Sequence, residues 1–213
     1  DDTIFDHYIE TIGILDMQKR GYLSRLSSKT TATILDVNGV GKLSGEFKQG
    51  ELDRKVNTLD TNEAVVEELS RYITNEGIRH MIVFCTSVDH AYSIKSLLNE
   101  KGVPTVCVEG AMDKIDCVVM LRPTLSTALY VQQAGRGLRV APNKERCLLL
   151  DFAENVKRHG PIGMLSAIPK GKTKGGEGVP PMKTCPECLG LLLASASVCP
   201  TCGHVFPKHK KEF

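Results

Sequence analysis

The sequence predicts an α/β protein with a parallel sheet covered by helices on both faces, followed by a small four-cysteine module. Short, uninterrupted apolar runs, typical of strands buried on both faces, alternate with amphipathic helical segments between about residues 56 and 160. Such alternation implies parallel strands joined by helical connections. Two Cys-x-x-Cys pairs near the C-terminus have the spacing of a metal site.

The individual elements follow from apolar spacing and from capping residues. A helix is expected from the N-cap candidates at 60–62 to Gly77, because apolar residues recur between them at helical intervals. A strand is expected over 81–85, and a second helix then ends at Gly102. Further elements are predicted as strands over 105–108, 117–121 and 147–152 and a helix over 126–134.

One connection is too short for this plan. Only eight residues separate the strands predicted over 105–108 and 117–121, whereas a parallel crossover needs a dozen or more. Either these strands are antiparallel, or residues are missing here. We favour missing residues and expect a chain break between Gly110 and Ile115.

Length and composition bound the class of protein. A chain of 213 residues with 41% hydrophobic and 24% charged residues fits one good-sized domain plus a small module. No apolar run approaches the ~18 residues of a membrane span, and the N-terminus lacks the pattern of a secretion signal. We therefore expect an intracellular protein without a membrane partner.

Composition also suggests the domain boundaries. Residues 1–55, with a helix expected near 3–20, precede the regular α/β region at 56–165. A glycine- and lysine-rich linker is expected over 166–181, and the cysteine module with a basic tail over 182–213. Net charge is only +2, but seven lysines and three acidic residues from Lys170 onward give this end a balance of +4. Such an arm either contacts phosphates or is simply a solvated tail.

The eight cysteines divide into two groups. Four occur singly in apolar runs and are expected to be small buried hydrophobes: Cys85, Cys107, Cys117 and Cys147. The other four form the two pairs: Cys185, Cys188, Cys199 and Cys202. Four thiolates in this spacing suit one tetrahedral zinc ion, with a redox dithiol pair or an iron centre as alternatives. His204 and His209 are spare potential ligands that we interpret as surface residues.

The most informative stretch is Gln-Gln-Ala-Gly-Arg-Gly-Leu-Arg at 132–139. It places Arg136 and Arg139 three residues apart, after a helix and among glycines that allow close approach of another surface. Arginine presents a rigid fork of donors to phosphate oxygens and can neutralise charge during phosphoryl transfer. Taken alone, the run is equally compatible with an exposed charged loop.

This stretch resembles motif VI of superfamily 2 helicases, Gln-x-x-Gly-Arg-x-x-Arg, at its four fixed positions: Gln132, Gly135, Arg136 and Arg139. The strand at 81–87 is similar to motif IV of the same lobe. The segments 121–126 and 150–161, together with the terminal cysteines, resemble bacterial RadD-type DNA-repair helicases. The sequence departs from the family pattern in lacking a P-loop, the magnesium motif and motif V, and in carrying Glu109 where a histidine is usual.

The resemblance implies that the chain is the second, RecA-like lobe of an ATP-dependent DNA helicase or translocase in DNA repair, in the bacterial cytoplasm and associated with the nucleoid. The motif VI residues would face ATP, with Arg136 and Arg139 as arginine fingers. The first lobe would be the partner that holds ATP and magnesium, so this chain alone would be inactive. Thr86 and Ser87 would contact single-stranded or branched DNA, unless they merely cap the next helix.

Two rival functions remain open. One is an adaptor with a degenerate lobe, whose zinc ribbon binds nucleic acid or a protein partner. The other is the motor part of a restriction-modification subunit, which shares these motifs.

Overall fold

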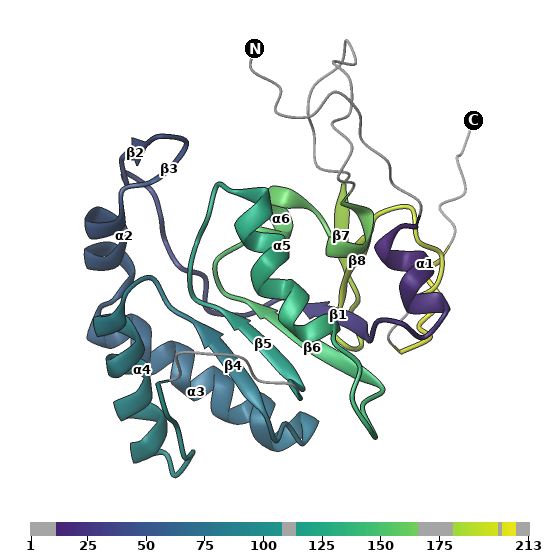
Figure 1. The fold of residues 1–213 in the computed structure, drawn as a ribbon, viewed down its shortest axis with the longest axis horizontal. Helices are drawn as coiled ribbons and strands as arrows, with labels where there is room; N and C mark the ends of the chain where they lie inside the picture. The colour runs from purple at the N-terminus through teal and green to yellow at the C-terminus, as the bar shows by residue number, and fades with distance from the viewer. Residues whose placement is uncertain (1–11, 108–113, 166–180, 200–201, 208–213) are drawn as a thin grey trace.

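A four-stranded, fully parallel sheet forms the centre of the protein. The structure, a computed structural model, describes residues 12–107, 114–165, 181–199 and 202–207. The strand order is β1-β6-β5-β4, and every neighbouring pair runs parallel (Figure 1). The strands are β1 (Arg25–Lys29), β4 (Met81–Phe84), β5 (Cys117–Met120) and β6 (Arg146–Asp151). The predicted α/β class with a parallel, RecA-like sheet is confirmed.

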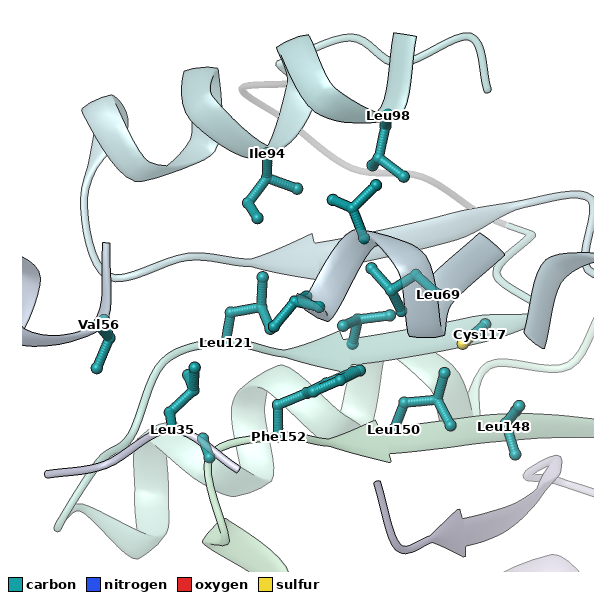
Figure 2. Packing of buried hydrophobic residues seen from close by; sticks show 14 of the residues in the cluster. Leu35, Val56, Leu69, Ile94, Leu98, Cys117, Leu121, Leu148, Leu150 and Phe152 are labelled. Atoms are coloured by element: carbon teal, nitrogen blue, oxygen red, sulfur yellow. The ribbon is translucent and has the colours of Figure 1, made fainter. Parts of the chain in front are cut away.

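Helices cover both faces of the sheet, which makes three layers. One face carries α2 (Gln49–Val56), α3 (Leu59–Glu76) and α4 (Val88–Glu100), and the other carries α5 (Thr127–Gly135) and α6 (Asn155–His159). Alternate residues of β5 point to opposite layers: Cys117 and Val119 pack toward α3 and α4, and Val118 and Met120 toward α5. Figure 2 shows the hydrophobic core between the sheet and the helices α2, α3 and α4, where helix residues such as Leu69 lie over Leu150 and Phe152.

The helix boundaries follow from their caps. The Thr58 hydroxyl accepts a hydrogen bond from the Thr61 amide at 3.4 Å, so α3 begins slightly before the expected cap at 60–62. It ends as predicted at Gly77, which takes the left-handed conformation at φ 62°. Ser126 caps α5 in the same way as Thr58 caps α3, by accepting from the Leu129 amide at 3.2 Å.

The prediction of a strand over 105–108 is wrong for residues 105–107, which the structure describes. Residues 103–107 form no strand, and the Thr105 amide donates to the Asn99 side chain at 2.9 Å, which ties this segment to the end of α4. Cys107 is consequently exposed rather than buried.

With no strand at 103–107, β4 connects to β5 through α4 and the whole stretch 85–116. This is long enough for a crossover, so the length argument for missing residues no longer holds. Most of the expected chain break, at 108–113, lies outside the described residues.

Residues 25–56 share the sheet and the core of the lobe. The short helix α1 (Ile14–Lys19) precedes β1, which pairs with β6 over its full length. A hairpin of β2 (Lys42–Leu43) and β3 (Glu46–Phe47) then leads into α2. Leu35 and Leu52 are buried in the same cluster as α3 and the strands. Residues on both sides of the boundary expected at residue 55 thus contribute to one hydrophobic cluster.

The cysteine module docks on the sheet through β1. Its hairpin consists of β7 (Met182–Thr184) and β8 (Leu191–Leu193). The Leu189 carbonyl accepts from the Thr30 amide at 3.1 Å and from the Thr30 hydroxyl at 3.2 Å, and Lys29 forms an antiparallel bridge with Gly190. The module thus pairs with the end of an otherwise free sheet edge, beside β1 in Figure 1. The predicted linker lies almost entirely outside the described residues.

Among the helices that the structure describes, none combines the length and apolar composition that crossing a bilayer requires.

The 3-10 turn η1 (Arg136–Leu138) presses directly on the sheet. A Cβ atom on Gly137 would lie 2.7 Å from the Cys147 sulfur and 3.0 Å from a Val118 methyl group, closer than packed atoms allow. Gly135 differs, because a Cβ atom there would meet no described atom within 4 Å. The fold therefore requires a glycine at 137 but not at 135.

This contrast predicts opposite effects for two substitutions only two residues apart. Gly137→Ala should destabilise the chain by about 1–3 kcal/mol, because the added methyl group overpacks the contact with β5 and β6. Gly135→Ala, in a helical backbone conformation, should be neutral or stabilise by up to about 1 kcal/mol. Urea denaturation of both variants measures the difference. Equal stabilities would contradict the close packing of this turn.

Candidate functional site: the arginine turn and the cysteine cluster

The arginine turn lies at the amino ends of the strands. Helix α5 starts beyond the carboxyl end of β5 and runs back along the sheet, so that η1 follows at the opposite edge. The Gly137 contacts locate it, since Leu26, Val118 and Cys147 are each the second residue of their strands. The backbone geometry of the fold therefore places Arg136 and Arg139 together at one edge of the sheet.

One side of this segment faces inward and the other outward. Gln133 and Ala134 are buried against the sheet, whereas Gln132 and Arg139 are exposed and Arg136 is half-buried. Within the described part of the chain, the Arg136 guanidinium makes no hydrogen bond or ion pair. An arginine fork held at a surface without an internal partner is available to an external anion.

Two residues that sequence reasoning missed hold this turn in place. The Ser24 hydroxyl donates to the Arg139 carbonyl at 3.0 Å, and the Lys144 ammonium donates to the same carbonyl at 2.7 Å. The Ser24 contact joins residues 115 positions apart. Such contacts leave no local pattern in the sequence, so only the fold reveals them.

The second predicted pair, Thr86 and Ser87, lies at the carboxyl edge of the sheet, opposite the arginine turn. Thr86 is buried, and its hydroxyl contacts the Asp53 carboxylate at 2.6 Å and the His90 ring nitrogen at 2.9 Å. Burial lowers the pKa of His90 to about 4, so the ring is neutral in this network at pH 7. Ser87 caps α4 by accepting from the His90 amide at 3.0 Å, which is the capping role left open above.

The segments 121–126 and 150–161 contact each other at this edge. The Asn155 side chain accepts from the Thr124 amide at 3.1 Å and donates to the Arg122 carbonyl at 3.0 Å. His159 contacts the Thr124 carbonyl at 3.0 Å through its ring nitrogen. The conformation of the loop after β5 is therefore fixed by the loop and helix after β6.

Glu46 of the β2–β3 hairpin completes this support. Its carboxylate accepts from the Leu125 amide at 2.8 Å and from the Ser126 amide at 3.2 Å. Partial burial opposes ionisation, but hydrogen bonds from Thr124 and from these amides hold the pKa of Glu46 below its ordinary value. The negative charge of Glu46 thus lies at the amino end of α5, where the helix dipole favours an anion.

A cavity of about 920 Å³ runs along the edge of β4 that pairs with no other described strand. Its lining includes Ser87, Tyr92 and Arg122. Tyr92 is 55% exposed, and the Arg122 guanidinium reaches the Gln49 side chain at 3.4 Å. Polar, aromatic and cationic groups therefore gather near the carboxyl end of β4, where open parallel sheets commonly bind ligands.

The four paired cysteines converge on one point, as their spacing predicts. Their sulfur atoms all lie within 4.8 Å of one another. The sulfurs of Cys185 and Cys202 are 3.6 Å apart, and those of Cys188 and Cys199 are 3.7 Å apart. Four thiolates at ~2.3 Å from a zinc ion in a tetrahedron would be ~3.8 Å apart. The set therefore fits such an ion, and the distances are too long for disulfide bonds.

The two cysteine turns have the same backbone design. The Leu189 amide donates to the Cys185 carbonyl at 3.0 Å, and the Gly203 amide donates to the Cys199 carbonyl at 2.9 Å. Both donor residues take positive φ angles, 58° for Leu189 and 77° for Gly203. A leucine in this region is strained, so the first turn needs support from its surroundings.

Of the two spare histidines, His204 does not belong to the cluster that the described cysteines form. The His204 ring packs edge-on against Phe206 at 4.9 Å and approaches the Glu187 carboxylate at 3.9 Å. His204 is half-buried rather than a plain surface residue, and His209 lies outside the described residues. Among the described residues, the buried members of the module's hydrophobic cluster are Leu192, Cys185 and Cys199. A metal ion held by the four cysteines would add folding energy to such a small core.

Comparison with known proteins gives distant relatives. No protein-family model matches the chain. The chain is 23% identical over 181 residues to the "Putative ATP-dependent helicase IRC3" of Saccharomyces cerevisiae, covering 70% of this chain and 26% of that protein. It is 22% identical over 217 residues to a "51.5 kDa protein" of a Lactococcus phage (isolate 7-9), covering 83% of this chain and 47% of that protein.

The chain thus spans about a quarter of the yeast protein and about half of the phage protein. The distant homology to the yeast protein supports a helicase-related family for this chain.

Proposed function

We propose that the chain is the second lobe of an ATP-dependent DNA helicase or translocase that acts in DNA repair. The observation that carries this proposal is the arginine turn. Gly135 has no packing role and Arg136 has no hydrogen-bond partner among the described residues, yet both lie on a turn that the sheet holds firmly. Such an arrangement is expected where a second protein surface closes over a charged ligand.

In the proposed mechanism, ATP and magnesium are held by a first lobe, which supplies the phosphate-binding loop. Gln132 and Gly135 lie against the nucleotide, and Arg136 and Arg139 direct their guanidinium groups at the phosphates. A cation placed where negative charge develops lowers the barrier to phosphoryl transfer. Closure and opening of the two lobes would then be coupled to each cycle of hydrolysis.

The DNA track is proposed at the carboxyl edge of the sheet, around Thr86 and Ser87. The buried Thr86 hydroxyl is already engaged with Asp53 and His90. The proposed phosphate contact therefore falls on the half-buried Ser87, with Arg122 and Tyr92 beside it in the β4 cavity. Backbone contacts of this kind would suit single-stranded or branched DNA without reading its sequence.

Replacing either arginine tests the catalytic proposal. In the whole protein, Arg136→Ala or Arg139→Ala should lower the rate of ATP hydrolysis by about 10³-fold or more, because charge stabilisation in the transition state is lost. The melting temperature should change little. Arg71→Ala is the control, since this arginine only forms an exposed ion pair with Glu67 on α3. Near wild-type turnover of both variants would make the motif a structural turn and favour the adaptor alternative.

The proposed division of the ATP site between two lobes leads to a second prediction. The 213-residue chain by itself should hydrolyse no ATP, with or without DNA, because it carries only the arginine half of the proposed site. Steady-state phosphate release measures this directly. DNA-stimulated turnover by the purified chain, abolished by Arg136→Ala, would contradict the division of the site between two lobes.

We propose zinc as the ion held by Cys185, Cys188, Cys199 and Cys202. Metal analysis should find one zinc ion per chain. Because the Leu189 carbonyl binds Thr30 beside β1, removal of the ion by a chelator should also lower the melting temperature of the lobe. Cys199→Ser should remove the zinc, whereas Cys107→Ser, at an exposed cysteine outside the cluster, should retain it. A metal-free reduced protein, or one equivalent of iron, would contradict the assignment.

A further inference from the structure

A tight turn brings Lys144 back over the arginine segment. The Lys144 amide donates to the Ala141 carbonyl at 3.2 Å, and Asn143 between them takes a left-handed backbone conformation at φ 60°. Asparagine tolerates this conformation better than most residues. The turn therefore aims the Lys144 side chain at residues that precede it in the chain.

The Lys144 ammonium binds two carbonyl groups of the arginine turn. It donates to the Gly137 carbonyl at 2.8 Å and to the Arg139 carbonyl at 2.7 Å, so it bridges the backbone on both sides of Leu138. Carbonyls at the end of a helix have no partner within the helix, and a cation is favourable there. One side chain thus fixes the backbone next to both arginines.

Ser24 holds the same backbone as well. Its amide donates to the Leu138 carbonyl at 2.8 Å and its hydroxyl to the Arg139 carbonyl at 3.0 Å. All three carbonyls from 137 to 139 therefore accept hydrogen bonds from Lys144, Ser24 or both. Ser24 is only 5% exposed and directly precedes β1, so this support is rigid.

Lys144 occupies this position at an energetic cost. Burial lowers the pKa of its ammonium below the ordinary value, which means that the charged form is less well solvated here than in water. In contrast, the exposed Lys101 forms an ion pair with Glu67 at the surface, at 3.0 Å. A partly buried charge that binds backbone carbonyls is suited to fixing the backbone conformation of the arginine turn.

We infer that Lys144 is a positioning residue for Arg136 and Arg139, holding the turn in the conformation in which both guanidinium groups meet the phosphates of ATP. The inference rests on the proposed function of the two arginines. Pre-organised charges need no rearrangement at the moment of reaction, and misplacement by about 1 Å can cost ~10²-fold in rate.

The test uses the whole protein and the Lys144→Met variant, which keeps the length of the side chain but loses the ammonium. The expected result is a fall in kcat of about tenfold or more, with KM for ATP and the melting temperature nearly unchanged. Lys144→Arg should recover most of the activity, because a guanidinium can also donate to two carbonyl oxygens. Lys101→Met is the matched control and should behave as wild type.

The outcomes separate this inference from the proposed function. If Arg136→Ala leaves turnover intact, the proposed function fails. If Arg136→Ala abolishes turnover but Lys144→Met has the wild-type kcat, only the positioning role is overturned. A loss in KM rather than kcat, or no recovery in Lys144→Arg, would also overturn it. Should Lys144→Met fail to fold, Lys144→Leu, which also removes the donor, takes its place with the same decisive outcomes.

Discussion

The contact between Gly137 and the amino ends of three strands is the constraint on which the arrangement of this protein depends. A hydrogen in place of a methyl group lets the turn after α5 lie directly on β1, β5 and β6. This close approach determines the position of the two neighbouring residues Arg136 and Arg139 at the edge of the sheet. It also brings the carbonyls of the turn within reach of Ser24 and Lys144. The packing of one glycine thereby couples the sheet, the turn and the proposed catalytic surface.

Strand β1 connects the arginine turn with the cysteine module. Just before its first residue, Ser24 binds the arginine turn, and just after its last residue, Thr30 binds the first cysteine turn. The strained Leu189 supplies the carbonyl for the second contact. Its backbone conformation is therefore stabilised by docking as well as by the hydrogen bond from its amide to the Cys185 carbonyl. The cysteine module thus contacts the lobe directly at the end of β1.

Sequence reasoning found the elements whose signals are local. The strands near 81–85, 117–121 and 147–152 are apolar runs, and glycines and capping residues mark the helices between them. The strand β1 was missed because an edge strand with two central serines has no apolar run. The run predicted as a strand over 105–108 forms no strand over its described residues 105–107. There the Thr105 amide instead donates to the Asn99 side chain of α4, so tertiary contacts outweigh the local pattern.

The same distinction applies to the candidate site. The four clustered cysteines were predicted because their ligand spacing is local, and their sulfur atoms do lie together. Ser24 was not predicted, because its contact exists only once the sheet brings the start of β1 to the arginine turn. Lys144 was not predicted either, because its contact depends on the tight turn that leads to it. The burial of Thr86 is likewise a tertiary effect, set by Asp53 and His90 from two other helices.

The central claim is that the arginine turn faces the phosphates of ATP when the two lobes close. The most direct measurement is a structure of the whole protein with ADP, magnesium and a fluoride mimic of the transferring phosphoryl group. We expect the Arg136 guanidinium at hydrogen-bond distance from the mimic, about 2.7–3.2 Å. A closed complex in which Arg136 and Arg139 both point away from the nucleotide would contradict it.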